Sequence, residues 1–107
     1  MRLNQQQVQL LITALTPFIK LNQAELRLFG SRVDDNAKGG DIDLLLLLQD
    51  THAAEQLAEE KYKILAAIKK YLGDQKIDLK IATTLDIQQD SFLQIILPTS
   101  IILHHWK

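Results

Sequence analysis

The chain has 107 residues, of which 47% are hydrophobic and 23% charged, as expected for one globular domain covering residues 1–107. Twelve Lys and Arg against thirteen Asp and Glu give a net charge of −1, so there is no positive field to drive direct nucleic-acid binding. The absence of Cys excludes disulfides, thiolate metal sites and cysteine nucleophiles. No apolar run approaches the roughly 20 residues needed to span a bilayer. We therefore expect a cytoplasmic protein that does not bind membranes.

The first third of the chain predicts a helix and a strand. Apolar residues at helical spacing, with Asn4 available as a cap and Pro17 near the end, predict an amphipathic helix from Gln5 to about Leu15. The run from Glu25 to Phe29 alternates polar and apolar residues and then meets Gly30. This pattern predicts a strand that ends in a sharp turn.

A buried strand and a covering helix follow. The run from Asp41 to Leu48 contains five consecutive leucines, a pattern expected of a central strand covered on both faces. Asp50 or Thr51 can cap the next helix, and Gly73 is well placed to end it. The residues expected on the covered side of this helix are Ala58, Tyr62, Leu65, Ile68 and Leu72.

The last third predicts another strand and a short helix. Alternation from Ile77 to Ile81 predicts a strand on which Asp78 points away from the core. The segment from Ser91 to Leu97 predicts a helix stopped by Pro98. For the apolar stretch from Ile101 to Leu103 we predict neither a helix nor a strand. The order helix, strand, strand, helix, strand, helix predicts an α/β (α+β) layer structure.

Three acidic residues are the candidates for chemistry. Asp41 and Asp43 are two apart on a predicted strand, so their carboxylates should project to the same side. Such a pair repels itself unless a cation intervenes, and hard oxygen ligands together with substrate phosphates suit magnesium. If the third strand lies beside the second, Asp78 would add a ligand from the same face. An isolated pair of this kind is also explained as the polar entry to a buried strand.

Gly30 and Ser31 stand at the end of the first strand. There a Gly allows close approach of the backbone, and a Ser hydroxyl with exposed amides can receive phosphate oxygens. A simple turn is the alternative explanation. What is specific is the order along the chain: an apolar strand, Gly-Ser, nine residues, Asp-Ile-Asp-Leu, a helix, and a strand with a lone Asp.

In this order the sequence resembles the minimal nucleotidyltransferase domains of the polymerase-beta-like superfamily, over nearly its whole length. The resemblance is carried by the segments L-F-G-S-R at 28–32, G-D-I-D-L at 40–44 and I-D-L-K at 77–80. It implies a small mixed sheet flanked by helices and a triphosphate, with ATP as the expected donor, positioned by Gly30 and Ser31. It further implies magnesium held by Asp41, Asp43 and Asp78, which are also the implied catalytic residues.

The resemblance also implies the reaction and its setting. A nucleoside monophosphate passes to a hydroxyl acceptor with loss of pyrophosphate, and minimal members occur as antitoxins paired with an all-helical HEPN-type toxin. We therefore expect a HEPN-type partner or a homo-oligomer. The chain departs from the family pattern at Asp34 and Asp35, which either point to solvent or weaken triphosphate binding. The alternative function is an inactive antitoxin that acts by contact with its partner.

Three further features of the sequence have an ordinary structural explanation beside a functional one. Arg32 either meets a phosphate or pairs with a neighbouring acid at the surface. Lys80 shares a strand face with Asp78 and could approach the nucleotide, although an ordinary salt bridge is the simpler expectation. His104 and His105 lie near the end of the sequence without an evident third ligand, so we expect no metal site there.

Overall fold

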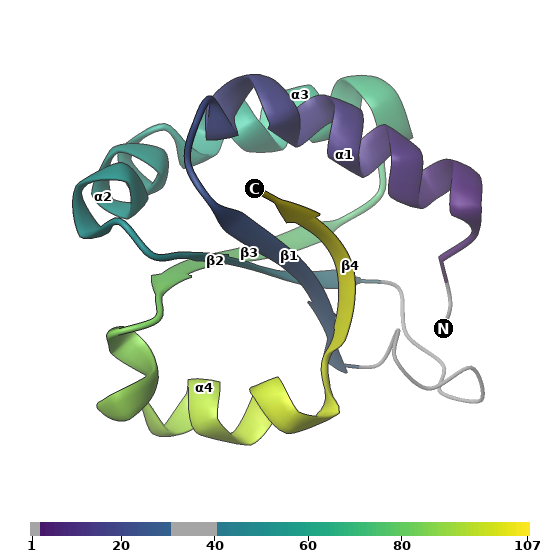
Figure 1. The fold of residues 1–107 in the computed structure, drawn as a ribbon. Helices are drawn as coiled ribbons and strands as arrows, with labels where there is room; N and C mark the ends of the chain where they lie inside the picture. The colour runs from purple at the N-terminus through teal and green to yellow at the C-terminus, as the bar shows by residue number, and fades with distance from the viewer. Residues whose placement is uncertain (1–2, 31–40) are drawn as a thin grey trace.

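The computed structural model describes residues 3–30 and 41–107, which form a four-stranded sheet between layers of helices (Figure 1). Its elements are α1 (Gln5–Ile19), β1 (Ala24–Phe29), β2 (Ile42–Leu48), α2 (Thr51–Glu59), α3 (Lys61–Leu72), β3 (Ile77–Thr83), α4 (Ser91–Ile96) and β4 (Ile101–Trp106), with short 3-10 turns η2 (Asp86–Gln88) and η3 (Leu97–Thr99) on either side of α4. The strand order is β3-β2-β1-β4, with β2 parallel to β3 and the other two pairs antiparallel. The predicted α+β fold with a small mixed sheet is therefore confirmed.

The five leucines of β2 serve two cores. Helices α1 and α3 cover one face of the sheet and α4 covers the other, as Figure 1 shows. Because successive side chains of a strand point to opposite faces, Leu44, Leu46 and Leu48 join the cluster under α1 and α3, while Leu45 and Leu47 join the cluster under α4. The expectation of a central strand covered on both faces is confirmed.

Helix α1 continues four residues beyond the predicted end, to Ile19. Its start is as expected, because Asn4 and Gln7 form a reciprocal capping box. Pro17 lies inside the helix and costs one backbone hydrogen bond in the last turn. Ile19 is fully buried, so burial of this last turn outweighs the lost hydrogen bond.

The single helix predicted between Asp50 and Gly73 is two helices, α2 and α3, which meet at Glu60. The two predicted ends are confirmed, since the Asp50 side chain accepts the backbone N–H groups of α2 and Gly73 follows α3 with a φ of 79°. The predicted covered side is wrong in its first half. Ala58 is exposed and Tyr62 is 67% exposed, because the small residues Ala53 and Ala54 let α2 approach the core with a different face. The later part is closer, with Ile68 buried and Leu65 and Leu72 half-buried.

Strand β4 was not predicted. It pairs with β1 at the edge of the sheet and carries the half-buried His104 edge-on to the ring of Trp106, at 4.7 Å between centroids. The indole N–H of Trp106 donates to the hydroxyl of Thr16 at 3.0 Å, and that hydroxyl donates in turn to the carbonyl of Ile12 at 2.6 Å. This chain of hydrogen bonds ties the last strand to the first helix.

We predict that Trp106→Phe lowers the free energy of unfolding by about 1–2 kcal/mol, because it removes the N–H donor and some buried surface while an aromatic ring remains. Urea denaturation followed by circular dichroism measures the loss. The variant Thr16→Val tests the hydrogen bond itself. If the bond contributes, the double variant should lose less than the two single losses added together, and strict additivity would show that it does not.

Candidate active site

Parallel pairing of β2 with β3 brings two of the predicted acids together. In the register of these strands, Asp43 is the direct partner of Asp78. Both residues lie on the sheet face that α4 covers, since Asp43 alternates in phase with the buried Leu45. Asp41 is described just before β2 begins, two residues from Asp43. The role expected for Asp78 required its strand to lie beside the strand of Asp43, and β3 does lie beside β2.

Gly30 lies against the carboxylate of Asp43. Phe29, the last residue of β1, is the direct partner of Asp43, and the chain then turns through Gly30 with a φ of 75°. A Cβ atom added to Gly30 would lie 2.3 Å from Asp43 Oδ2 and 3.1 Å from its Cγ. Only glycine combines this backbone conformation with so close an approach.

Asp43 carries the electrostatic cost of this arrangement. Burial, followed by the charges of Asp78 and Asp41, raises the pKa of Asp43 above its ordinary value. Each of these influences disfavours the ionised carboxylate. Asp41 is partly relieved by Lys76, whose Nζ lies 3.7 Å from Asp41 Oδ2 in an ion pair open to solvent. A cation bound between Asp41, Asp43 and Asp78 would reduce the repulsion among their carboxylates.

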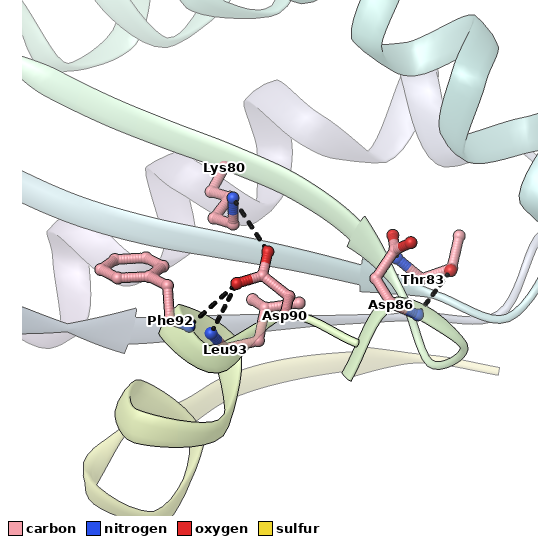
Figure 2. Close-up of polar contacts among 6 residues, drawn as sticks. All are labelled: Lys80, Thr83, Asp86, Asp90, Phe92 and Leu93. Atoms are coloured by element: carbon pink, nitrogen blue, oxygen red, sulfur yellow. Dashed lines mark hydrogen bonds and ion pairs between the residues drawn. The ribbon is translucent and has the colours of Figure 1, made fainter. Parts of the chain in front are cut away.

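Lys80 lies on the same face of β3 as Asp78 but is held by helix α4. Its Nζ is 3.7 Å from Asp90 Oδ2, and both side chains are about one-third exposed. Figure 2 shows that Asp90 also caps α4, because its other oxygen accepts the backbone N–H groups of Phe92 and Leu93 at 2.9 and 3.3 Å. The expectation of an ordinary salt bridge for Lys80 is confirmed, with a partner that sequence had not identified.

The turn that leads from β3 toward α4 is also held by side chains. The backbone N–H of Thr83 donates to Asp86 Oδ2 at 2.8 Å, and the backbone N–H of Asp86 donates to Thr83 Oγ1 at 3.3 Å (Figure 2). These reciprocal bonds satisfy polar groups where the strand ends. They direct the chain back so that α4 lies over the same sheet face as Asp78.

A cavity of about 300 Å³ lies beside Asp78. Its lining residues are Phe29, Lys61, Asp78, Leu79, Lys80 and Phe92. Sequence reasoning did not single out Lys61 or Phe92. The run D-S-F-L at 90–93 could have indicated the helix cap that places Phe92, but no sequence pattern indicates that its ring faces an acidic site.

Several predicted residues lie outside the described ranges. These are Ser31, Arg32, Asp34, Asp35 and Gly40. Within residues 3–30 and 41–107, no group of three or more His, Cys, Asp and Glu side chains is arranged to hold a metal ion by itself. His104 and His105 are no exception. The site described here therefore comprises Gly30, three carboxylates and the adjoining cavity.

Comparison with known families agrees with this arrangement. Residues 12–102 match the family model described as nucleotidyltransferase domain, a range that contains Gly30 and all three acids. No curated protein matches the chain significantly. Among the described residues, no helix is both long and apolar enough to cross a membrane.

We predict that Asp43→Asn raises the melting temperature of the metal-free protein at pH 7. The raised pKa means that the folded chain binds a proton at Asp43 more tightly than the unfolded chain does. Stability from this group is therefore complete below the unfolded pKa of about 3.9 and is lost as the pH rises through the folded pKa. The difference between variant and wild type should vanish below about pH 4.

Thermal denaturation in EDTA between pH 3.5 and 8 measures this effect. Asp74→Asn is the matched control, because the side chain of Asp74 is 91% exposed and lies in a solvent-screened ion pair. A lower melting temperature for Asp43→Asn at pH 7 would contradict the raised pKa.

We predict that Gly30→Ala costs about 1–3 kcal/mol of stability, from the positive φ and from the clash with Asp43. Gly73→Ala separates the two causes, since Gly73 has a φ of 79° but no atom within 4 Å of an added Cβ. Adding Asp43→Ala should recover part of the loss in Gly30→Ala and none of the loss in Gly73→Ala. Urea denaturation gives each value, and equal recovery in both backgrounds would refute the contact.

Proposed function

The chain belongs to the nucleotidyltransferase domain family, and we propose that it is a magnesium-dependent enzyme that transfers AMP from ATP to a hydroxyl acceptor. Family membership supports nucleotidyl transfer as the general reaction. The observation that carries the proposal for this chain is the register of β2 and β3, which sets Asp43 opposite Asp78 with Asp41 two residues away. Gly30 supports it because its missing Cβ lets the backbone at the end of β1 lie directly against the carboxylate of Asp43.

The donor set fits magnesium. Carboxylate oxygens are hard ligands, and magnesium in nucleotide sites commonly takes one or two carboxylates together with substrate phosphates and water. A complete cage of protein ligands is therefore not required. The raised pKa of Asp43 supports the same assignment, because a bound cation would offset the burial and repulsion that disfavour its charge. We propose Asp41, Asp43 and Asp78 as the ligands.

The proposed transfer gives Asp78 a second role besides metal binding. The acceptor oxygen forms a bond to the alpha-phosphorus of ATP, the bond from that phosphorus to the beta-phosphate oxygen breaks, and pyrophosphate leaves. Asp78 would accept the proton of the attacking hydroxyl, and the backbone at Gly30 with Ser31 would position the triphosphate. Bound magnesium would supply charge neutralisation for the phosphates and a lower pKa for the hydroxyl.

The acceptor and the setting form the outer part of the proposal. We place the acceptor hydroxyl on a partner protein of the HEPN toxin type, on the strength of the resemblance to antitoxin-type minimal domains. Residues 1–107 would act in the cytoplasm as one nucleotidyltransferase domain. No described residue favours the alternative of an inactive antitoxin.

We predict that the purified protein transfers label from alpha-labelled ATP only with magnesium, either to itself or to the product of a neighbouring gene. Replacing one ligand, as in Asp43→Asn or Asp78→Asn, should reduce the rate at least about 100-fold, because several kcal/mol of charge stabilisation are lost. Asp74→Asn removes an exposed carboxylate and should leave the rate unchanged.

Equilibrium binding separates an inactive protein from a missing acceptor. If magnesium-dependent ATP binding occurs without transfer, the acceptor is absent from the assay, and further candidate proteins are added. If neither binding nor transfer occurs, the enzyme proposal fails and a contact-only antitoxin replaces it.

A further inference from the structure

The cavity beside Asp78 is not needed for the proposed roles of Gly30 and the three carboxylates. We propose that it holds the nucleoside of the donor, with the exposed ring of Phe92 as the surface on which the base stacks. The inference rests on the proposed function and assigns the nucleotide a place within it. It predicts recognition through ring contact with little selectivity among bases.

The ring of Phe92 is fixed in place and still open to a ligand. Phe29 meets it edge-on, with 5.9 Å between ring centroids and an interplanar angle of 81°, and Lys80 Nζ lies 5.5 Å from its centroid. The backbone N–H of Phe92 is bound by Asp90. With all these contacts, Phe92 remains 45% exposed and lines the cavity. A ligand that stacks on it meets a preorganised surface.

The size and lining of the cavity suit a nucleoside. Its volume of about 300 Å³ lies at the lower end of the range for small-molecule sites. The rings of Phe29 and Phe92 provide apolar walls, and Lys61 and Lys80 bring ammonium groups that can donate to base or ribose oxygens. Among the residues that the structure describes, the lining has no amide side chain of the kind that reads a base edge through paired hydrogen bonds. Stacking, which every base can provide, is therefore the main attraction.

Position favours the nucleoside over the acceptor as the occupant. The nucleoside is joined to the alpha-phosphate through its 5′-oxygen, so it must lie directly beside the carboxylates at which that phosphate reacts. The cavity meets this condition because Asp78 is part of its wall. Two other cavities, one lined by Ile102 and Leu103 and one by Glu25 and His105, contain none of the three carboxylates.

The test compares two probes in the presence of magnesium. One is an ATP analogue with a methylene group between the alpha- and beta-phosphorus atoms, which cannot be turned over, and the other is inorganic tripolyphosphate, which has no nucleoside. Isothermal titration calorimetry measures both with wild type, Phe92→Ala, Phe92→Leu and Phe92→Trp. Phe92→Leu keeps an apolar side chain against Phe29, and circular dichroism verifies that each variant is folded.

We expect Phe92→Ala to weaken binding of the analogue about 5- to 150-fold, the range for loss of one base–aromatic stack. Phe92→Leu should also weaken binding of the analogue, whereas Phe92→Trp should retain wild-type affinity because its ring can still stack. Tripolyphosphate should bind all four proteins equally. The corresponding analogues of the other three nucleotides should bind wild type within about tenfold of the adenine compound, because stacking tolerates every base.

Other outcomes are distinguishable. Unchanged analogue binding by both Phe92→Ala and Phe92→Leu overturns the inference, and if transfer to the acceptor falls at the same time, the cavity belongs to the acceptor. A preference above about 100-fold for one base overturns recognition by stacking, since it requires hydrogen bonds to the base edge. If wild type binds neither probe, the proposed function itself fails.

Discussion

Two carboxylates stand opposite one another on adjacent parallel strands, and the chain keeps them there against their mutual repulsion. Asp43 and Asp78 are direct partners in the register of β2 and β3, and Asp43 is also half-buried. The rest of β2 provides the compensation, because the five leucines that follow Asp43 pack into both cores. A one-residue slip of β2 would move those leucines and Asp43 to the wrong faces together, so the hydrophobic pattern also fixes the register of the acids.

The charges around the site are balanced locally. Asp41 has an ion pair with Lys76, and Lys80 has one with Asp90, so these two cations are already engaged. Asp43 is different, since the described charges that act most strongly on it are negative. Asp43, whose charge is the least compensated of the three, is therefore also the acid against which the backbone of Gly30 packs. This coincidence is the reason for proposing a cation and phosphate site here in place of a simple polar entry to a buried strand.

Sequence reasoning succeeded where the pattern is local and failed where pairing is distant. The leucine run, the Asn4 cap and the alternation around Asp78 each reflect neighbouring residues, and the elements they predicted are present. Strand β4 depends on pairing with β1, more than seventy residues earlier in the chain, and its apolar run of three residues is too short to indicate a strand by itself. For the site, the three acids and Gly30 could be chosen from their order along the chain. Phe92 could not, because its nearness to Asp78 arises only from the packing of α4 on the sheet.

The same face of β2 supports both parts of the site. Helix α4 has six residues, too few to be stable alone, so it depends on its Asp90 cap and on the packing of Leu93 and Ile96. Those two side chains lie in the cluster with Leu45 and Leu47, which share the phase of Asp43 along β2. The strand that presents a carboxylate at its start therefore also anchors, two and four residues later, the helix that carries Phe92. Because rigid elements hold both groups, the distance between the carboxylates and the cavity wall is set by the core and does not depend on a loop.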